Sequence, residues 1–265
     1  MTRLLIVNTR AGDGDAAKLL EEARRREIET HVLGDHEDPA EAARATDAAA
    51  IGIAGGDGSI AAVAAVAVER GLPLVVVPFG TRNHFARDLG LDDPVHTLRA
   101  FAGGHERAVD VGYANDRLFL NNVSLGLYAR LVHRRERHRR RRDAFARARA
   151  LGTLLRHRRD EGITVDGRPA DARVVLVSNN AYELSVLSLG TRERLDEGRL
   201  HLCEAHGLFR PSWDERSGTS ITVDARAGSV RAAVDGEPEL LDTPIAFRIA
   251  PGALRVLLPE PKGGE

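Results

Sequence analysis

The stretch AAAIGIAGGDGS, residues 48–59, decides the fold. Its first seven residues form an apolar run typical of a buried strand, and the run breaks sharply at a pair of glycines. Residues 58–69 are rich in Ala and Val and predict a helix. Glycine allows positive φ angles and close approach of a phosphate, and the start of a helix presents unpaired N–H groups. The stretch therefore predicts a buried strand, a turn that suits phosphate, and a helix.

Strand-like and helix-like segments alternate on both sides of this stretch. Strands are expected at 4–7, 30–33 and 72–79, and helices at 15–27 and 39–46. Continuous apolar runs are expected of parallel strands that are buried on both faces. Repeated strand–helix units predict an α/β domain with a doubly wound parallel sheet. Ligands of such a sheet bind at the carboxyl ends of its strands, which here end at Val7, Ala54 and Val77.

The pattern changes near residue 107. Short strands with turn residues between them predict a β-rich, antiparallel, sandwich-like second domain. We therefore predict an α/β nucleotide-binding domain over 1–106 and a β-rich acceptor domain over 107–265, with a basic helical insertion at about 127–159. The last strand, 254–258, can pair with either domain. The other strands of the second domain are expected at 107–113, 117–124, 162–165, 173–178, 198–205, 220–224, 229–235 and 244–249.

Composition limits the class of protein. The chain has 265 residues, a formal net charge of -1 and a single cysteine, Cys203, which excludes an internal disulfide. No apolar stretch approaches the roughly 20 residues needed to cross a bilayer, and the N-terminus lacks the layout of a secretory signal. These features predict a cytoplasmic protein whose membrane contact, if any, is peripheral.

Four further motifs accompany the GGDGS turn. They are the loop NTRAG at 8–12, the segment PFGTRNHFARDLG at 78–90, NVSLG at 122–126 and VDGE at 234–237. In this order the motifs resemble those of the diacylglycerol kinase catalytic family, which includes bacterial lipid kinases and sphingosine kinase relatives. NAD kinases share the GGDG turn but lack the Gly80-Thr81-Arg82-Asn83 segment, so this segment favours the lipid kinases.

The resemblance implies an ATP- and Mg²⁺-dependent enzyme that transfers a phosphoryl group to a hydroxyl of a diacylglycerol-like lipid. It also implies a fold like that of NAD kinases and diacylglycerol kinases, and a place in phospholipid biosynthesis. Asp57 would act through magnesium, because a carboxylate repels phosphate directly. Taken alone, the turn is equally well explained as a tight turn in which Asp57 or Ser59 caps the helix. The implied nucleotide site comprises Asn8, Gly12, Gly55, Gly56, Asp57, Gly58, Ser59, Thr81 and Asn83.

The late VDGE motif and a segment before it supply the remaining candidates. The resemblance implies that Glu237 is the general base and that Asp235 supports it or helps to hold magnesium. A surface turn is the alternative, because Asp-Gly is a strong turn former. Glu197 stands where some bacterial members have an aspartate that binds a structural magnesium, and a solvated hairpin turn is the equal alternative.

Three positions depart from the family pattern. The first loop lacks the usual proline, and Ser59 replaces a threonine but keeps the hydroxyl. His84 replaces an aspartate, so that it is expected to have a capping or surface role. One hypothesis is that Asp88, four residues further on, partly replaces the missing carboxylate.

Residues 130–159 contain thirteen arginines and only two acidic residues. They predict a basic, partly amphipathic helix or helix pair that binds an anionic membrane surface, at the inner face of the membrane. A solvated helix is the close alternative. Nucleic-acid binding is disfavoured, because Phe145 is the only aromatic residue in the segment available for base stacking.

Two other functions stay open at this point. One is a kinase of a soluble hydroxyl substrate on an NAD kinase-like scaffold, and the other is a non-catalytic protein that binds a nucleotide or a lipid. The retained Asp57, Asn83 and Glu237 argue against the second. The predicted partners are a lipid substrate and a membrane surface, and a homodimer is left open.

Overall fold

The computed structural model describes residues 2–12, 14–126, 162–170, 174–182, 184–185, 188–189, 191–206 and 212–260. Two compact units divide the chain. Unit 1 consists of Met1–Val111, Leu189–Glu197 and Ala250–Glu265, and unit 2 consists of Gly112–Ser188 and Gly198–Ile249. The predicted functional division at residue 106 stays a prediction. The arginine-rich segment 130–159 lies outside the described residues.

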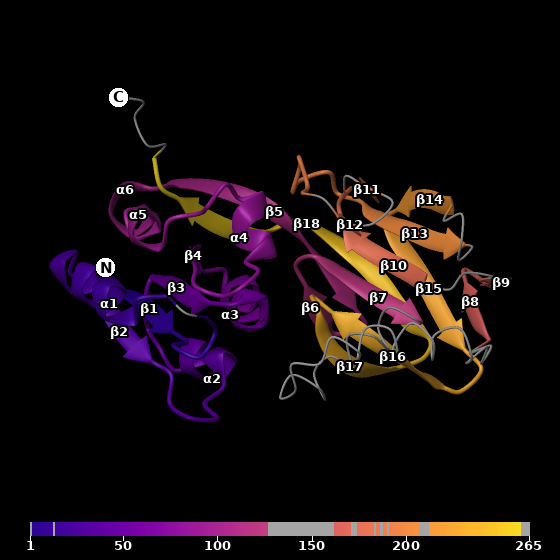
Figure 1. Cartoon of the computed structure of the whole chain (residues 1–265), viewed down its shortest axis with the longest axis horizontal. Helices are drawn as coiled ribbons and strands as arrows, with labels where there is room; N and C mark the ends of the chain where they lie inside the picture. Colours follow the sequence, from indigo (N-terminus) through magenta and orange to yellow (C-terminus); the bar gives the residue numbers. More distant parts are fainter. Residues whose placement is uncertain are drawn as a thin grey trace, which may run out of the picture. The chain divides into compact units, whose positions relative to one another are not determined.

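Parallel strands form the sheet of unit 1, in the order β2-β1-β3-β4 (Figure 1). All five residues of β4 are buried, which explains why its sequence is a continuous apolar run. The chain leaves β1 toward one side of the sheet to form β2 and returns past β1 to form β3. This reversal is the mark of a doubly wound sheet. The strands are β1 (Arg3–Val7), β2 (Glu29–Val32), β3 (Ala50–Gly55) and β4 (Leu74–Pro78).

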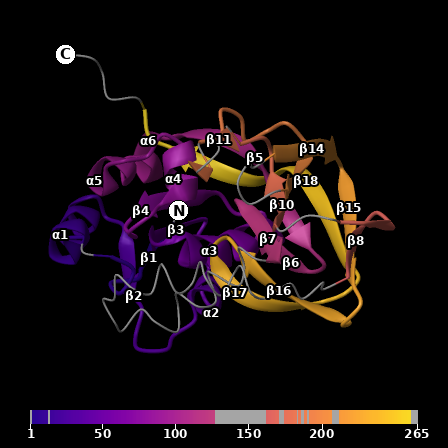
Figure 2. The same cartoon turned by 45° about the vertical axis from the view of Figure 1, so that its right-hand side comes forward.

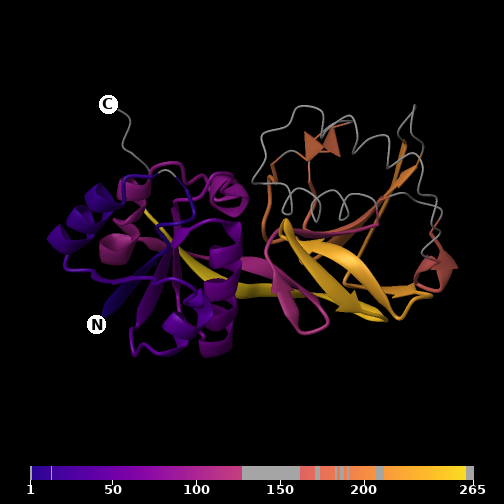
Figure 3. The same ribbon diagram turned by 60° about the horizontal axis from the view of Figure 1, so that its bottom comes forward.

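Helices cover both faces of this sheet (Figures 1 and 3). Helix α1 uses the predicted apolar face, on which Leu19 and Ala23 are buried, and it packs with α5 and α6 over Leu5, Val7 and Val75. Helices α2 and α3 pack against each other. The helices are α1 (Ala16–Arg25), α2 (Pro39–Arg44), α3 (Asp57–Arg70), α4 (His84–Asp88), α5 (Pro94–Thr97) and α6 (Ala100–Gly103).

Unit 2 contains a six-stranded antiparallel sheet in the order β14-β13-β10-β7-β16-β17 (Figure 2). One face of this sheet packs on strands β15 and β18 of the other sheet, through a shared apolar core. Phe119 and Phe247 meet there edge to face, with ring centroids 6.3 Å apart. The strands are β7 (Asn122–Gly126), β10 (Val174–Asn179), β13 (Leu200–His206), β14 (Ser212–Gly218), β16 (Ser229–Val234) and β17 (Glu237–Asp242).

The remaining strands join the ten-stranded mixed sheet, in which β18 follows β4 in parallel and pairs with β15 in the antiparallel sense. The predicted α/β fold with a β-rich, sandwich-like second part is confirmed. These strands are β5 (His105–Ala114), β6 (Arg117–Phe119), β8 (Ile163–Val165), β9 (Arg168–Pro169), β15 (Ser220–Ala225) and β18 (Ile245–Leu258). A small separate sheet pairs β11 (Leu184–Ser185) with β12 (Ser188–Leu189).

Two strand predictions were wrong. The strand expected at 117–124 is broken at residues 120–121, because their N–H groups bind the Asp235 carboxylate instead of a neighbouring strand. The strands expected at 244–249 and 254–258 are a single strand, β18, shown in yellow in Figure 3. Gly252 has a φ of 59° and donates its N–H to Asp110 Oδ1 at 2.8 Å, so that the chain passes through Pro251-Gly252 without ending the strand. In the described part of the chain, no helix is long and apolar enough to span a membrane.

Candidate functional site

The doubly wound sheet reverses its strand order between β1 and β3. At such a switch point, the loops after the two strands diverge and leave a crevice for a ligand. Asn8 follows β1 and Ser59 follows β3, and the Asn8 side-chain amide donates to Ser59 Oγ at 2.9 Å. Two of the predicted site residues, 51 positions apart in sequence, are therefore joined at this point of the sheet.

Helix α3 begins directly after β3, with Gly56 at its N-cap. No side chain of the described residues caps this helix by a hydrogen bond. The alternative in which Asp57 or Ser59 caps α3 is therefore wrong, because both side chains have partners elsewhere. A 14-residue helix with an uncapped start directs N–H groups and the positive end of its dipole outward. This arrangement suits an anion such as a phosphate.

Glycines let three turns come into contact beside this helix start. A Cβ on Gly80 would lie 2.5 Å from Gly56 Cα, and a Cβ on Gly12 would lie 2.6 Å from the Phe79 carbonyl oxygen. A Cβ on Gly55 would lie 2.9 Å from the Cβ of Ser59. No side chain larger than a hydrogen fits at these positions without displacing a neighbour. At Gly12 and Gly80 the sequence requires glycine because the turns after β1, β3 and β4 pack backbone against backbone.

Asn83 closes the turn that follows β4. Its side chain accepts from Gly80 N–H and donates to the Gly80 carbonyl, both at 2.8 Å. The residue has a left-handed φ of 49°, which asparagine tolerates better than most residues. Thr81 stands between Gly80 and Asn83 in the sequence of this turn, and it is exposed to solvent. The conformation of Gly80–Asn83 is thus fixed by a residue that the turn itself contains.

Asp57 joins the GGDGS turn to the next one. Its Oδ1 accepts from the backbone N–H of Phe85, in the first turn of α4, at 3.2 Å. The carboxylate therefore binds a free N–H group at the start of α4, whereas neither Asp57 nor Ser59 caps α3. Magnesium needs oxygen ligands, but the described residues contain no group of three His, Cys, Asp or Glu that could hold a metal ion. A metal role for Asp57 stays a prediction.

All nine predicted nucleotide-site residues lie on these three turns or at the start of α3. Gly58 is the second residue of α3 and is half-buried with its neighbours. Their place at the ends of predicted parallel strands indicates this convergence from the sequence. The Asp57–Phe85 bond was not predicted, because nothing in the sequence marks a backbone N–H as the partner of a distant carboxylate.

His84 and Asp88 lie at opposite ends of α4. His84 is exposed at the start of α4, where Asn83 is the N-cap and makes no side-chain capping bond. Asp88 lies at the opposite end of the same helix and forms an ion pair with Arg192. A part for Asp88 in replacing the missing carboxylate stays a prediction.

The predicted base and its supporting residue lie in unit 2. Asp235 has a left-handed φ of 49°, and its carboxylate accepts hydrogen bonds from three consecutive backbone N–H groups, those of residues 120, 121 and 122, at 2.8, 2.7 and 3.1 Å. Glu237 is the exposed first residue of β17, two residues further on. The Asp235 contacts therefore fix the turn that presents Glu237. A role for Asp235 in holding magnesium stays a prediction.

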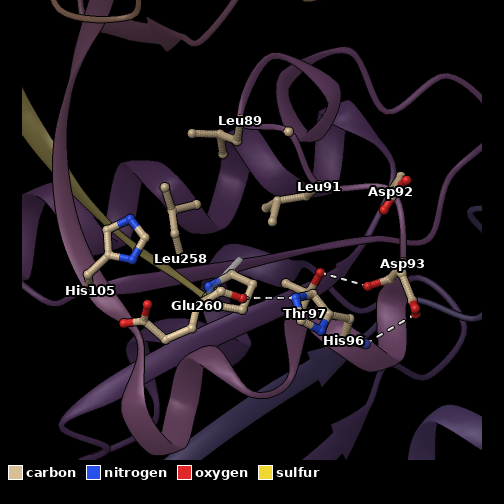
Figure 4. A pocket seen from close by; sticks show the side chains of 11 residues that line it. Leu89, Leu91, Asp92, Asp93, His96, Thr97, His105, Leu258 and Glu260 are labelled. Carbon is tan, nitrogen blue, oxygen red and sulfur yellow. Dashed lines mark hydrogen bonds between the residues drawn. The ribbon is translucent and has the colours of Figure 1, made fainter. Parts of the chain in front are cut away.

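A cavity of about 430 Å³ is also found in unit 1 (Figure 4). Its apolar side is formed by Leu89, Leu91 and Leu258, and its polar side includes His96 and Glu260. The His96 ring nitrogen Nε2 lies 3.2 Å from the Glu260 carbonyl oxygen. None of the predicted site residues lines this cavity, so it is separate from the glycine turns.

The fold and the turns define an α/β protein whose glycine turns meet, beside the uncapped start of α3, at the switch point of its sheet. Residues 2–114 match the family model of the diacylglycerol kinase catalytic domain. A relative from Klebsiella pneumoniae (strain 342), described as a probable lipid kinase YegS-like, is 30% identical over 116 residues, or 43% of this chain and 32% of the relative. One from Pseudomonas aeruginosa (strain UCBPP-PA14), with the same description, is 32% identical over 132 residues, or 49% of this chain and 37% of the relative.

Solved structures agree with these sequence matches. The crystal structure of a diacylglycerol kinase from Bacillus anthracis str. Sterne has a TM-score of 0.69 and 20% identity, and the match covers 98% of this chain and 97% of that one. At this identity the likeness shows the fold. The resemblance to the diacylglycerol kinase catalytic family is confirmed, and the chain is similar to its lipid kinases. The matches span well under half the length of the two sequence relatives.

Proposed function

We propose that the chain is an ATP-dependent lipid kinase that transfers the γ-phosphoryl group to a hydroxyl of a diacylglycerol-like lipid. One observation carries the proposal: three glycine turns meet at the switch point of the sheet, beside the uncapped start of α3. Phosphoryl transfer depends chiefly on positioning the phosphates and neutralising their charge. Relatives described as probable lipid kinases support a lipid as the acceptor.

The nucleotide phosphates would bind against the backbone of these turns. The glycines admit phosphate oxygens to the N–H groups of residues 56–59, and the Asn8–Ser59 bond holds two of the turns together. Asn83 and Thr81 would bind from the third turn. Mg²⁺, carried by the phosphates, would neutralise their negative charge, and Asp57 is the carboxylate of this group that would contact the ion or its water shell.

Glu237 is the proposed general base. An exposed carboxylate can accept the proton of the lipid hydroxyl as the hydroxyl oxygen bonds to the γ-phosphorus and ADP leaves. Asp235 would contribute by holding the Glu237 turn through the N–H groups of residues 120–122. A lipid acceptor also implies peripheral contact with a membrane and a part in phospholipid metabolism, which belong to the same proposal.

The test is transfer of radiolabelled phosphate from [γ-³²P]ATP to a panel that contains diacylglycerol, other lipid alcohols and soluble alcohols. We expect a labelled lipid product that requires added Mg²⁺. The Glu237→Gln variant should lose at least about 100-fold in transfer while it still binds ATP, because only the proton acceptor is removed. Asp242→Asn, which changes an exposed carboxylate on the same strand, is the matched control and should keep wild-type activity.

Two outcomes would contradict the proposal. Labelled soluble alcohol without any lipid product would assign the acceptor to another class. Near-normal transfer by a folded Glu237→Gln protein would remove the proposed base.

A further inference from the structure

Arg192 and Asp88 form a buried ion pair in unit 1. The guanidinium nitrogens Nε and Nη2 of Arg192 both lie 2.7 Å from Asp88 Oδ2. The side chain of Arg192 is 0% exposed and that of Asp88 is 4% exposed. The two residues are 104 positions apart, and Asp88 is the last residue of α4. The pair therefore attaches the segment 191–197 to the helix that follows the Gly80–Asn83 turn.

A second attachment lies three residues further along this segment. The carbonyl of Leu195 accepts from the backbone N–H of Asp110, in β5, at 2.7 Å. Leu195 is 1% exposed. Asp110 is itself buried and accepts from Gly252 N–H in β18. These two contacts hold the segment against α4 and β5.

The charges in the segment do not fit the structural magnesium that the sequence resemblance suggests at Glu197. Arg194 Nε donates to the Asp196 carboxylate at 3.1 Å, and Arg192 neutralises Asp88. Magnesium is bound by oxygen ligands in near-octahedral geometry. Here Asp88 is paired with Arg192 and Asp196 with Arg194, and no group of three His, Cys, Asp or Glu is found among the described residues. Arginine side chains of the segment therefore neutralise both of these aspartates.

We propose that the Asp88–Arg192 ion pair holds residues 191–197 in place in this chain, where the resemblance implies a structural magnesium. The pair also acts on α4. This helix has five residues, its N-terminal turn is bound by Asp57 and its C-terminal residue by Arg192. Asp88 and Arg192 are therefore positioning residues for the Gly80–Asn83 turn, a consequence that rests on the proposed nucleotide site.

The first test needs neither nucleotide nor lipid. Thermal unfolding of the full chain is measured in EDTA and in excess MgCl₂, and the same melting temperature is expected in both. A clear rise with magnesium would overturn the proposal, because it would show a cation bound to the folded protein.

The second test breaks the pair. Arg192→Met should lower the melting temperature and speed amide hydrogen exchange over residues 84–88 and 191–197, because it leaves a buried carboxylate without its partner. Asp88→Asn is the milder variant if the first does not fold. The double variant Asp88→Leu/Arg192→Met should recover much of the loss, since an apolar pair can replace a buried ion pair. Arg194→Met, which breaks an exposed pair, is the control and should change neither measurement. Wild-type exchange in Arg192→Met would overturn the proposal.

The third test concerns the turn. A fluorescent ATP analogue should bind Asp88→Asn about fivefold or more weakly than wild type, at a temperature where both are folded. Unchanged affinity together with faster exchange would confine the pair to a structural role and overturn the positioning consequence. If the wild-type chain does not bind the analogue at all, the proposed function fails. The melting and exchange measurements still decide whether the ion pair or a metal holds the segment.

Discussion

Replacing Gly80 by alanine tests whether the glycine turns form the nucleotide site. A Cβ at this position would lie 2.5 Å from Gly56 Cα, 2.9 Å from Asn83 Oδ1 and 3.1 Å from Gly56 N. Carbon atoms in contact are normally about 3.5–4.0 Å apart, so that the turns after β3 and β4 must separate by about 1 Å. Two of these three atoms belong to the backbone of Gly56 at the start of α3, which cannot rotate aside as the end of a side chain can.

The size of the effect follows from this displacement. Inserting a methyl group into a filled space costs about 1–3 kcal/mol in stability. Misplacing groups by about 1 Å at a site can cost about 100-fold in rate. We therefore expect Gly80→Ala to lower the melting temperature by about 5 °C and to reduce phosphoryl transfer by about 100-fold.

The assay combines thermal unfolding, titration with a fluorescent ATP analogue and phosphate transfer from [γ-³²P]ATP. Gly103→Ala is the matched control, because a Cβ on this α6 residue meets no atom within 4 Å and its φ is not left-handed. A folded Gly80→Ala protein with wild-type affinity and wild-type transfer would refute the reasoning, since it would show that the contact between the two turns does not matter for the nucleotide.

Two further predictions concern unit 2. Asp235→Ala should destabilise the protein by about 3 kcal/mol in denaturant unfolding, because the N–H groups of residues 120–122 lose their acceptor. Asp116→Ala, which removes an exposed carboxylate, is the control. Equal stability of the two variants would show that the carboxylate contacts contribute nothing. Burial, and secondarily the charge of Glu215, raise the pKa of the Cys203 thiol to about 12. Because a raised pKa keeps the thiol protonated throughout the neutral range, iodoacetamide should label Cys203 only as the protein unfolds; labelling of the native protein at pH 8 as fast as a free thiol would contradict this.

Much of unit 1 could be predicted from the sequence because its signals are local. The apolar run of β4 is buried along its whole length, and the apolar face of α1 is the one that packs. The three strand ends were predicted to lie at one edge of a parallel sheet, and the residues that follow them are in contact. Burial on both faces makes β3 and β4 continuous apolar runs, which a single sequence shows directly.

Features that depend on distant partners could not be predicted. β17 begins Glu237-Pro238-Glu239 and appears polar, because it is the edge strand of its sheet, where charge and proline are tolerated. The Asp88–Arg192 pair joins residues 104 positions apart. Taken alone, each is a charged residue of the kind that usually lies on the surface, so the sequence does not mark it as buried. A single sequence contains no periodicity that marks either feature.

The path of β18 has a consequence for synthesis of the protein. Its second half, residues 250–258, belongs to unit 1, where the strand lies beside β4 in parallel. On the ribosome, β4 therefore emerges long before β18, its neighbour on the side away from β3, by a delay on the order of ten seconds. During that time one edge of this apolar strand is unpaired, so that it can bind chaperones or pair with a wrong strand. The stretch that matches the kinase family, residues 2–114, would keep this edge open permanently if it were produced alone.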